Sequence, residues 1–220
     1  MNPINKFNIK KFVVGYIQTN MYLIINNKKG VIIDPGFVDS ESDALIKKVK
    51  SECRKIPAVL LTHGHYDHIS GLGIIKEKFN SIIYCHKLEQ EKLTDGEKNG
   101  YKMAAKFFGL DTKFKTGKMP NPDKYLVGGE EIELIGLAFN IIHTPGHTCG
   151  GISILLGNVL FSGDTIFKSS IGRADLYDSS YEDEISSIKN KILTLPPDTI
   201  IYPGHGPETT VKDEKKYFNI

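Results

Sequence analysis

The feature that most constrains this chain is the run Thr62-His63-Gly64-His65-Tyr66-Asp67-His68, which places three imidazoles and a carboxylate within six consecutive positions. The run follows an apolar stretch over 58–61 that predicts a short buried strand, and its glycine indicates a loop that turns into a helix. Imidazole and carboxylate are ligands for borderline divalent metals such as zinc or iron. The chain has seven histidines, so three in one run favour a metal site over a polar loop. Alternating positions can face two neighbouring ions, with His63 and His65 on one side and Asp67 and His68 on the other.

Three further ligand-type residues follow downstream, each in a similar local pattern. His147 lies in Pro-Gly-His, Asp164 in Gly-Asp-Thr and His205 in Gly-His-Gly. Each follows an apolar, β-branched run and sits at a turn marked by glycine or proline. We therefore expect all three in loops at strand ends, where they could complete the site.

Length and composition predict one globular domain spanning 1–220, with 40% hydrophobic and 25% charged residues. The net charge of +2 comes from basic residues that are spread along the chain, so nothing favours nucleic-acid binding. No apolar stretch approaches the roughly twenty residues of a membrane span, and the N-terminus lacks a signal-peptide pattern, so we expect a cytoplasmic protein without membrane contact. Three widely spaced cysteines argue against a disulfide framework, and we expect Cys149 to be a small buried apolar residue.

Strands and helices are expected in two similar halves, each ending in ligand-bearing loops. The first half has predicted strands over 7–14, 20–25, 31–34, 58–61 and 81–84, with helices over 40–53 and from the metal loop through 79. The second has predicted strands over 131–135, 138–143, 151–156, 158–162 and 199–202, with a helix over 181–194. Ser40 with Asp43 predicts a capping box. The polar, helical segment 86–118 is expected to wall the active-site cleft.

The ligand order His-x-His-x-Asp-His, a lone His, Gly-Asp-Thr and a final Gly-His resembles the metallo-β-lactamase superfamily from about Gly15 to the C-terminus. Segments 145–148, 170–175 and 204–210 are most similar to the short glyoxalase II-like (hydroxyacylglutathione hydrolase-like) enzymes. The resemblance implies an α/β fold, the αββα four-layer sandwich, with two central mixed sheets and helices outside. Two sheets packed face to face also fit the predicted order of elements.

The resemblance also implies two divalent metal ions per chain, with zinc expected first and iron or manganese as alternatives. It implies that one ion is held by His63, His65 and His147, the other by Asp67, His68 and His205, and that Asp164 bridges them. Two such cations lower the pKa of a shared water enough to produce hydroxide near neutral pH, which attacks a carbonyl. Asp67 is the predicted catalytic residue, because it could hold this hydroxide in orientation.

Three residues outside the predicted ligand set have expected roles of their own. By the resemblance, Asp34 of Asp-Pro-Gly either orients a ligand histidine or simply closes its turn. His143 is expected to make a structural hydrogen bond, and His86 to lie on the surface at a helix start.

Similarity to glyoxalase II implies a small-molecule thioester substrate, such as S-lactoylglutathione, that is cleaved to an acid and a thiol. Arg173 occupies the position at which that family binds glutathione, although it could instead form an ion pair with Asp175. We expect no C-terminal glutathione-clamping domain after Ile220, so a related ester is also open. The oligomeric state is not predicted.

Persulfide dioxygenases are the nearest alternative. They hold a single iron with counterparts of His63, His147 and Asp164, a triad suited to oxygen chemistry. The complete second ligand set favours the hydrolase. Lactonase, ester hydrolase and β-lactamase activities are less favoured, the last because the best-known zinc β-lactamases carry a cysteine at the second site. A non-catalytic scaffold predicts a degraded ligand set, but here every position is filled.

Overall fold

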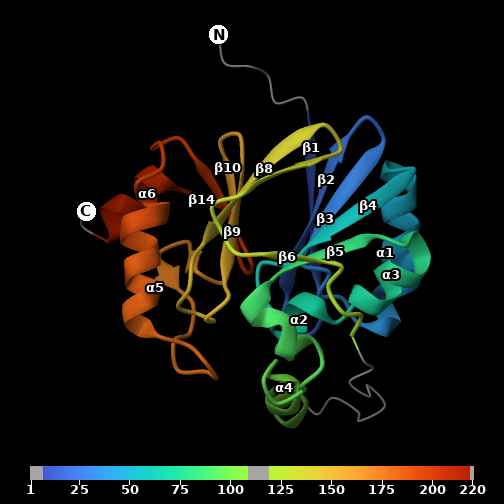
Figure 1. The fold of residues 1–220 in the computed structure, drawn as a ribbon, viewed down its shortest axis with the longest axis horizontal. Helices are drawn as coiled ribbons and strands as arrows, with labels where there is room; N and C mark the ends of the chain where they lie inside the picture. The colour runs from blue at the N-terminus through green and yellow to red at the C-terminus, as the bar shows by residue number, and fades with distance from the viewer. Residues whose placement is uncertain (1–6, 109–118, 219–220) are drawn as a thin grey trace.

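Two six-stranded sheets lie face to face, with helices on the outer face of each (Figure 1). This computed structural model describes residues 7–108 and 119–218. The strand orders are β1-β2-β3-β4-β5-β6 and β14-β13-β10-β9-β8-β7. The first sheet consists of β1 (Asn8–Val14), β2 (Thr19–Asn26), β3 (Lys29–Ile33), β4 (Lys55–Leu60), β5 (Ile82–His86) and β6 (Lys124–Leu126). The second consists of β7 (Glu131–Leu134), β8 (Leu137–His143), β9 (Ile152–Leu156), β10 (Val159–Gly163), β13 (Ile200–Pro203) and β14 (Thr209–Thr210). A separate small ribbon pairs β11 (Ile166–Phe167) with β12 (Ser170–Ile171).

Helices form the two outer layers. Helices α1 (Asp39–Glu52) and α3 (Leu72–Phe79) cover the first sheet, while α5 (Tyr181–Ser187) and α6 (Val211–Tyr217) cover the second (Figure 1). A π-helical turn over Ile188–Ile192, η2, continues α5. Helix α2 (Tyr66–Ile69) lies with α3 between β4 and β5 in the chain, and the 3-10 helix η1 (Lys87–Leu93) and α4 (Tyr101–Phe108) lie between β5 and β6. The predicted αββα arrangement with two mixed sheets is confirmed. In the described part of the chain, no helix combines the length and apolar character that a membrane crossing needs.

Strand β2 shows why the sheets stack, because successive side chains point to opposite faces. Met21 and Leu23 enter the core beneath α1 and α3, whereas Tyr22 and Ile24 enter the core between the sheets. A third core, which includes Ile188, lies between the second sheet and its helices. Fully burying one such aliphatic side chain contributes about 1.5–3 kcal/mol, so these three cores hold the four layers together.

The arrangement of parallel strands brings the ligand-bearing loops to one end. Strands β3 and β4 are parallel, as are β10 and β13, so within each pair the carboxyl ends lie at the same edge. The loops that follow carry Asp34, the 62–68 run, Asp164 and His205. The His147 loop follows β8. Open α/β sheets bind their ligands outside such carboxyl ends.

Some predicted details were wrong. The helix predicted through residue 79 is broken into α2 and α3, and the Ser40–Asp43 capping box is not formed. Instead, the Glu41 carboxylate accepts hydrogen bonds from Val38 N at 3.0 Å and Gly15 N at 2.9 Å. A long-range partner thus fixes this helix start. The short strands β6 and β14 and helix α6 lay outside the predicted elements, and residues 109–118 of the predicted insertion lie outside the described residues.

Candidate metal centre

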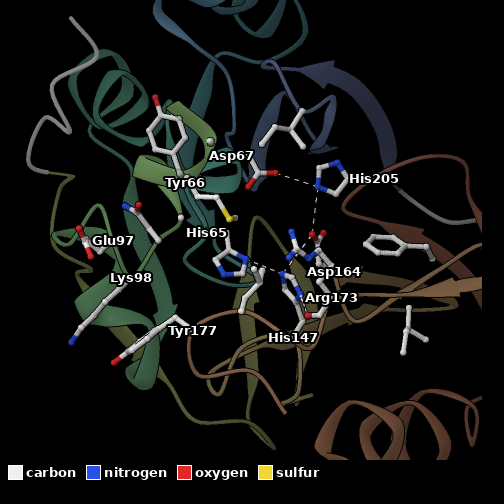
Figure 2. A pocket seen from close by; sticks show the side chains of 18 residues that line it. His65, Tyr66, Asp67, Glu97, Lys98, His147, Asp164, Arg173, Tyr177 and His205 are labelled. Atoms are coloured by element: carbon white, nitrogen blue, oxygen red, sulfur yellow. Dashed lines mark hydrogen bonds and ion pairs between the residues drawn. The ribbon is translucent and has the colours of Figure 1, made fainter. Parts of the chain in front are cut away.

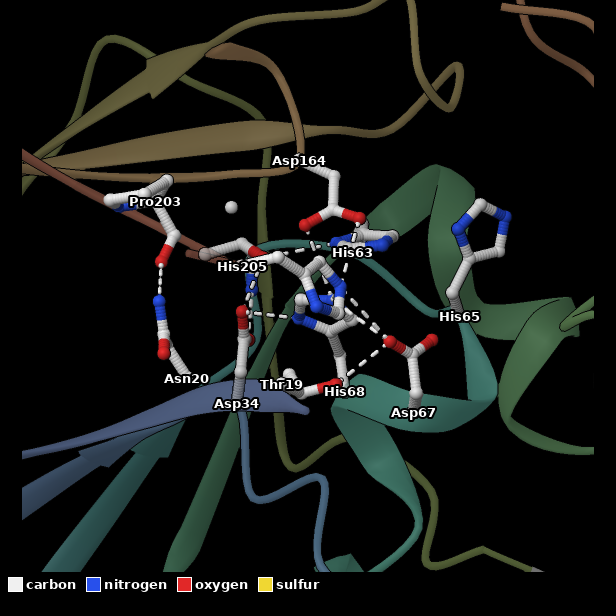
Figure 3. A network of polar contacts seen from close by, with 12 residues as sticks. Thr19, Asn20, Asp34, His63, His65, Asp67, His68, Asp164, Pro203 and His205 are labelled. Carbon is white, nitrogen blue, oxygen red and sulfur yellow. Dashed lines mark hydrogen bonds and ion pairs between the residues drawn. The ribbon is translucent and has the colours of Figure 1, made fainter. Parts of the chain in front are cut away.

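The seven residues predicted as ligands gather at the carboxyl ends of the strands (Figures 2 and 3). Two clusters of ligand atoms, each within 4.8 Å, match the predicted sets: His63 with His65 and His147, and Asp67 with His68 and His205. A third, Asp34 with His63 and His68, links them. Asp164 faces both clusters. Its Oδ2 lies 3.7 Å from His147 Nε2 and 3.4 Å from His205 Nε2, while its Oδ1 lies 3.3 Å from His68 Nε2.

Hydrogen bonds to the outer ring nitrogens aim three of these histidines inward. His63 Nδ1 lies 3.0 Å from Thr62 Oγ1, and His147 Nδ1 lies 2.8 Å from the Arg173 carbonyl. His68 Nδ1 lies 2.9 Å from Asp34 Oδ2. Each contact assigns the proton to Nδ1 and leaves the Nε2 lone pair toward the centre, as in metal sites where a second group orients each histidine.

The donor set fits divalent metal ions. His63 Nε2 is buried without a hydrogen-bond partner among the described residues. His65 Nδ1 and His147 Nε2 lie 2.8 Å apart, two ring nitrogens turned toward each other. A buried, unpaired nitrogen costs free energy unless something binds it, and a shared cation would satisfy all three imidazoles.

Asp34 orients a candidate ligand rather than only closing its turn. Its Oδ1 accepts from Thr62 N at 2.8 Å, and its Oδ2 accepts from Thr62 Oγ1 at 2.6 Å while facing His68 Nδ1. One buried carboxylate therefore fixes both the start of the metal loop and the ring of His68. Asp34 has a positive φ of 51°, a conformation that aspartate tolerates better than most residues.

Two residues at the start of strand β2 hold the second cluster in place. The sequence analysis did not predict this support. Thr19 Oγ1 donates to Asp67 Oδ2 at 2.8 Å. Asp67 Oδ2 also lies 3.2 Å from His205 Nε2. Asn20 Nδ2 donates to the carbonyls of Pro203 and Gly206 at 3.0 and 2.9 Å, so it clamps the loop that carries His205 (Figure 3). The only sequence signal was two polar residues at the start of a fully buried strand.

The His147 loop is anchored from helix α5. Glu184, fully buried, accepts a hydrogen bond from His147 N at 2.6 Å, and Ser187 Oγ donates to the Pro145 carbonyl at 2.7 Å. A side chain at Gly146, whose φ is +147°, would collide with the backbone of Glu184, so glycine is needed at this close approach.

The family model for the Metallo-beta-lactamase superfamily matches residues 14–205. The chain belongs to the metallo-β-lactamase superfamily. It is 35% identical, over 95% of both chains, to "Hydroxyacylglutathione hydrolase GloC" of Haemophilus influenzae. Among solved structures, BLEG-1 B3 metallo-beta-lactamase is 35% identical with a TM-score of 0.83, covering 95% of this chain and 97% of that one. TTHA1623 in a di-iron-bound form is 31% identical with a TM-score of 0.75, covering 94% of this chain and 98% of that one.

The histidine pKa values are shifted in opposite directions in the two ligand clusters of this candidate metal site. Burial lowers the pKa of His63 well below its ordinary value, and burial together with His147 lowers the pKa of His65 to about 3. Burial has the same effect on His68 and His205, but facing carboxylates outweigh it. They raise the pKa of His68 well above its ordinary value and that of His205 to about 10.

Metal binding should therefore release protons and strengthen as the pH rises. In the metal-free protein, protonated His205 stabilises the fold fully below about pH 6.5, and this contribution is lost as the pH rises toward 10; the raised pKa of His68 acts in the same direction. A metal ion must displace these protons. For each proton displaced, the apparent Kd for the metal falls about tenfold for each unit that the pH rises. Zinc competition with a chelator between about pH 6.5 and 8.5, with calorimetry in buffers of different ionisation enthalpy, measures both effects. With alanine in place of both His68 and His205, zinc binding by the three-histidine cluster should no longer depend on pH in this range. An unchanged pH dependence would show that these two histidines do not release the protons.

The metal clusters open into a cleft of about 420 Å³ (Figure 2). The predicted wall over 86–118 contributes in its described part: Glu97, Lys98, Asn99, Gly100, Met103 and Ala104 line the cleft. Residues 171–177 contribute further lining, and the Tyr177 ring lies 5.5 Å from Lys98 Nζ. Arg173 lines the cleft too, but its guanidinium forms a bidentate pair with Asp175 at 2.9 and 3.0 Å, both side chains being exposed. Both predicted roles of Arg173 are therefore open to its side chain.

The remaining histidines and Cys149 do not join the ligand clusters. His143 Nε2 lies 3.0 Å from the Cys149 carbonyl, which agrees with its expected structural role. His86 does begin a helix, but it is buried rather than on the surface, stacked on His143 at 4.5 Å between ring centroids. Cys149 is half-buried rather than fully buried, and its Sγ lies 3.1 Å from Asp178 Oδ2.

Proposed function

We propose that this chain is a dinuclear metal-dependent thioester hydrolase, with S-lactoylglutathione as its first substrate to test. The observation that carries the proposal is the complete set of inward-facing ligand atoms, two clusters with Asp164 between them, at the floor of a cleft. The name of the Haemophilus influenzae relative supports the thioester. We propose zinc in both positions, with iron or manganese as alternatives; the di-iron form of TTHA1623 makes iron the first alternative.

The chain would hold one ion with His63, His65 and His147 and the other with Asp67, His68 and His205, with Asp164 shared. When bound, two such ions supply a water of lowered pKa and polarise the carbonyl that it attacks. Asp67 has a second role in this proposal. It lines the cleft, and its Oδ2 is held by Thr19, so the carboxylate is fixed where it can accept a hydrogen bond from the attacking water.

The cleft suits a thioester of moderate size. Its volume of about 420 Å³ falls within the roughly 300–1,000 Å³ typical of small-molecule sites. Ile17, Met103 and Leu176 offer apolar contacts on its walls. The two lining cations, Lys98 and Arg173, are positioned for an acidic thiol such as glutathione, although each already pairs with a carboxylate.

The decisive measurement is turnover of S-lactoylglutathione by metal-loaded protein, with His65→Ala as the control. We expect loss of the thioester with the parent protein and none with the variant, because His65 faces His147 across one ligand cluster. If Arg173 binds the acidic thiol, Arg173→Met should raise KM about two- to fivefold with kcat unchanged, the size of an exposed ion-pair contact. Asp175→Asn, which frees the guanidinium, should lower KM instead. No turnover by folded, metal-loaded protein would overturn the thioester proposal.

β-Lactam hydrolysis is the second candidate, because the solved structure of BLEG-1 is similar over nearly the whole chain. The same metal centre could open a lactam, so the two candidates differ in the cleft walls rather than in the ligands. A chromogenic cephalosporin assayed beside the thioester separates them. We expect the thioester to have the higher kcat/KM, and the reverse order would move the assignment.

Persulfide oxidation would use only His63, His147 and Asp164. The second cluster then has no required role, so His205→Ala should abolish a dinuclear hydrolase but only weaken a mononuclear oxygenase. Oxygen uptake with glutathione persulfide, measured on both proteins, distinguishes the two.

A further inference from the structure

A buried ion network lies directly behind the metal centre. Glu89 and Lys92 on η1 are 0% and 1% exposed. Lys92 Nζ lies 3.3 Å from Glu89 Oε2 and 2.5 Å from Asp178 Oδ2. Charged groups are seldom buried unless they are paired and hydrogen-bonded, so this Glu89–Lys92–Asp178 network requires a reason in the structure.

The Glu89 carboxylate joins the two loops that carry the three-histidine cluster. Its Oε2 accepts from Gly64 N at 2.7 Å, between His63 and His65 in sequence. Its Oε1 accepts from Gly150 N at 2.9 Å, in the loop that carries His147. A Cβ at Gly150 would lie 2.6 Å from Glu89 Oε1, so glycine permits this close approach. One buried carboxylate thus sets the spacing of loops that lie far apart in the sequence.

The other end of the network reaches the third support of the same cluster. Asp178 belongs to the loop whose Arg173 carbonyl accepts the hydrogen bond from His147 Nδ1. Cys149 Sγ also contacts Asp178, at 3.1 Å. Tyr177, next to Asp178, lines the cleft (Figure 2), and its ring lies 6.0 Å from Lys92 Nζ. The network therefore connects both loops of the three-histidine cluster with one wall of the cleft.

The second cluster has supports outside the Glu89–Lys92–Asp178 network. Asp34 holds His68, Thr19 holds Asp67, and Asn20 holds the loop of His205. Within residues 7–108 and 119–218, no hydrogen bond or ion pair joins Glu89, Lys92 or Asp178 to Asp67, His68 or His205. The network thus contacts the centre on the side of the three-histidine cluster, whereas Asp34, through Thr62 and His68, touches both halves.

We propose that the Glu89–Lys92–Asp178 network is a positioning device for the three-histidine metal site and sets the affinity of that site much more strongly than that of the second site. Hydrogen bonds that orient metal-ligand loops change metal affinity by about 10–100-fold when they are removed. Glu89→Gln keeps the size of the side chain but removes its charge and one of its two acceptors. The inference rests on the proposed metal site and does not depend on which substrate is turned over.

The test measures zinc affinity, by chelator competition, in two backgrounds that each retain one site. With His205→Ala removing the second cluster, Glu89→Gln should weaken zinc binding about 10–100-fold. With His65→Ala removing the first cluster, the same change should alter the Kd less than about threefold. Glu91→Gln, on the same helix but exposed, is the matched control and should leave zinc affinity unchanged in both backgrounds.

Thermal unfolding of the metal-free variants separates positioning from loss of the fold. If Glu89→Gln alone does not fold because Lys92 loses a partner, Glu89→Gln with Lys92→Met removes both charges, and the same comparison is made. Selective weakening of the three-histidine site supports the proposal. Unchanged affinity at that site, or equal weakening of both sites in folded protein, would overturn it. Since the readout is metal affinity, a failed thioesterase assay would not count against this inference.

Discussion

Replacing Asp164 with asparagine should lower kcat for thioester hydrolysis by at least about 10²–10³-fold, the usual cost of removing one preorganised electrostatic group from an active site. Asp164 faces three histidines from both clusters, with Oδ1 toward His68 and Oδ2 toward His147 and His205. Asparagine has the same shape but lacks the charge, and its amide nitrogen cannot act as a metal ligand. We therefore expect metal content to fall from two ions per chain toward one.

Rates at saturating substrate and metal analysis of the purified variant measure the two effects. Asp198→Asn provides the matched control, since Asp198 is exposed and precedes the amino end of β13, whereas the ligand-bearing loop follows the carboxyl end of that strand. A variant that keeps two metal ions and the parent rate would show that Asp164 does not bridge the two positions.

Replacing Gly36 with alanine should damage the metal centre through the backbone. A Cβ at Gly36 would overlap the carbonyl oxygen of Asp67, so α2 and the ligands that it carries would have to move. We expect a loss of about 1–3 kcal/mol in the free energy of unfolding, as for other overpacked sites. Zinc affinity should fall about 100-fold, because Asp67 and His68 are displaced together.

The glycine at the start of α3 provides a matched control. A Cβ at Gly73 would meet nothing closer than Pro120 Cδ at 4.0 Å. Gly73→Ala should therefore leave metal affinity unchanged and add up to about 1 kcal/mol of stability, because alanine favours the helix. Denaturant unfolding and zinc titration of both variants test the pair. If Gly36→Ala and Gly73→Ala have the same stability and zinc affinity, the close contact between Gly36 and α2 does not restrict the side chain at position 36.

The long elements were predictable because their apolar periodicity is a local property. Strand β2 has buried residues on both faces, and the sequence 20–25 already shows this as an unbroken apolar run apart from its first residue. Short elements such as β14 and α6 have too few residues for periodicity to show. The start of α1 was misassigned because its N-cap, Val38, has no polar side chain to mark it in the sequence; the Glu41 carboxylate binds the amides of Val38 and Gly15 instead.

The candidate ligands were predictable because imidazoles and carboxylates in that order are rare outside metal sites. Their supports were not. Thr19 and Glu184 are ordinary polar residues in sequence, and only the fold places them against Asp67 and His147. His86 was expected on the surface because a helix start usually is exposed, whereas stacking on His143 buries it.

The sequence by itself determined the two-sheet αββα class, the family and the chemical identity of the candidate ligands, since these depend on residue types and on patterns read along the chain. Only the tertiary structure decided which ligand atoms face one another, that Asp34 supports His68, and that Glu89 and Lys92 lie buried behind the three-histidine cluster. The physical reason is that a hydrogen bond or ion pair between distant segments depends on how sheets and loops pack. The residues around a position in the sequence do not show which distant segment will pack against it, so a buried glutamate cannot be told from an exposed one.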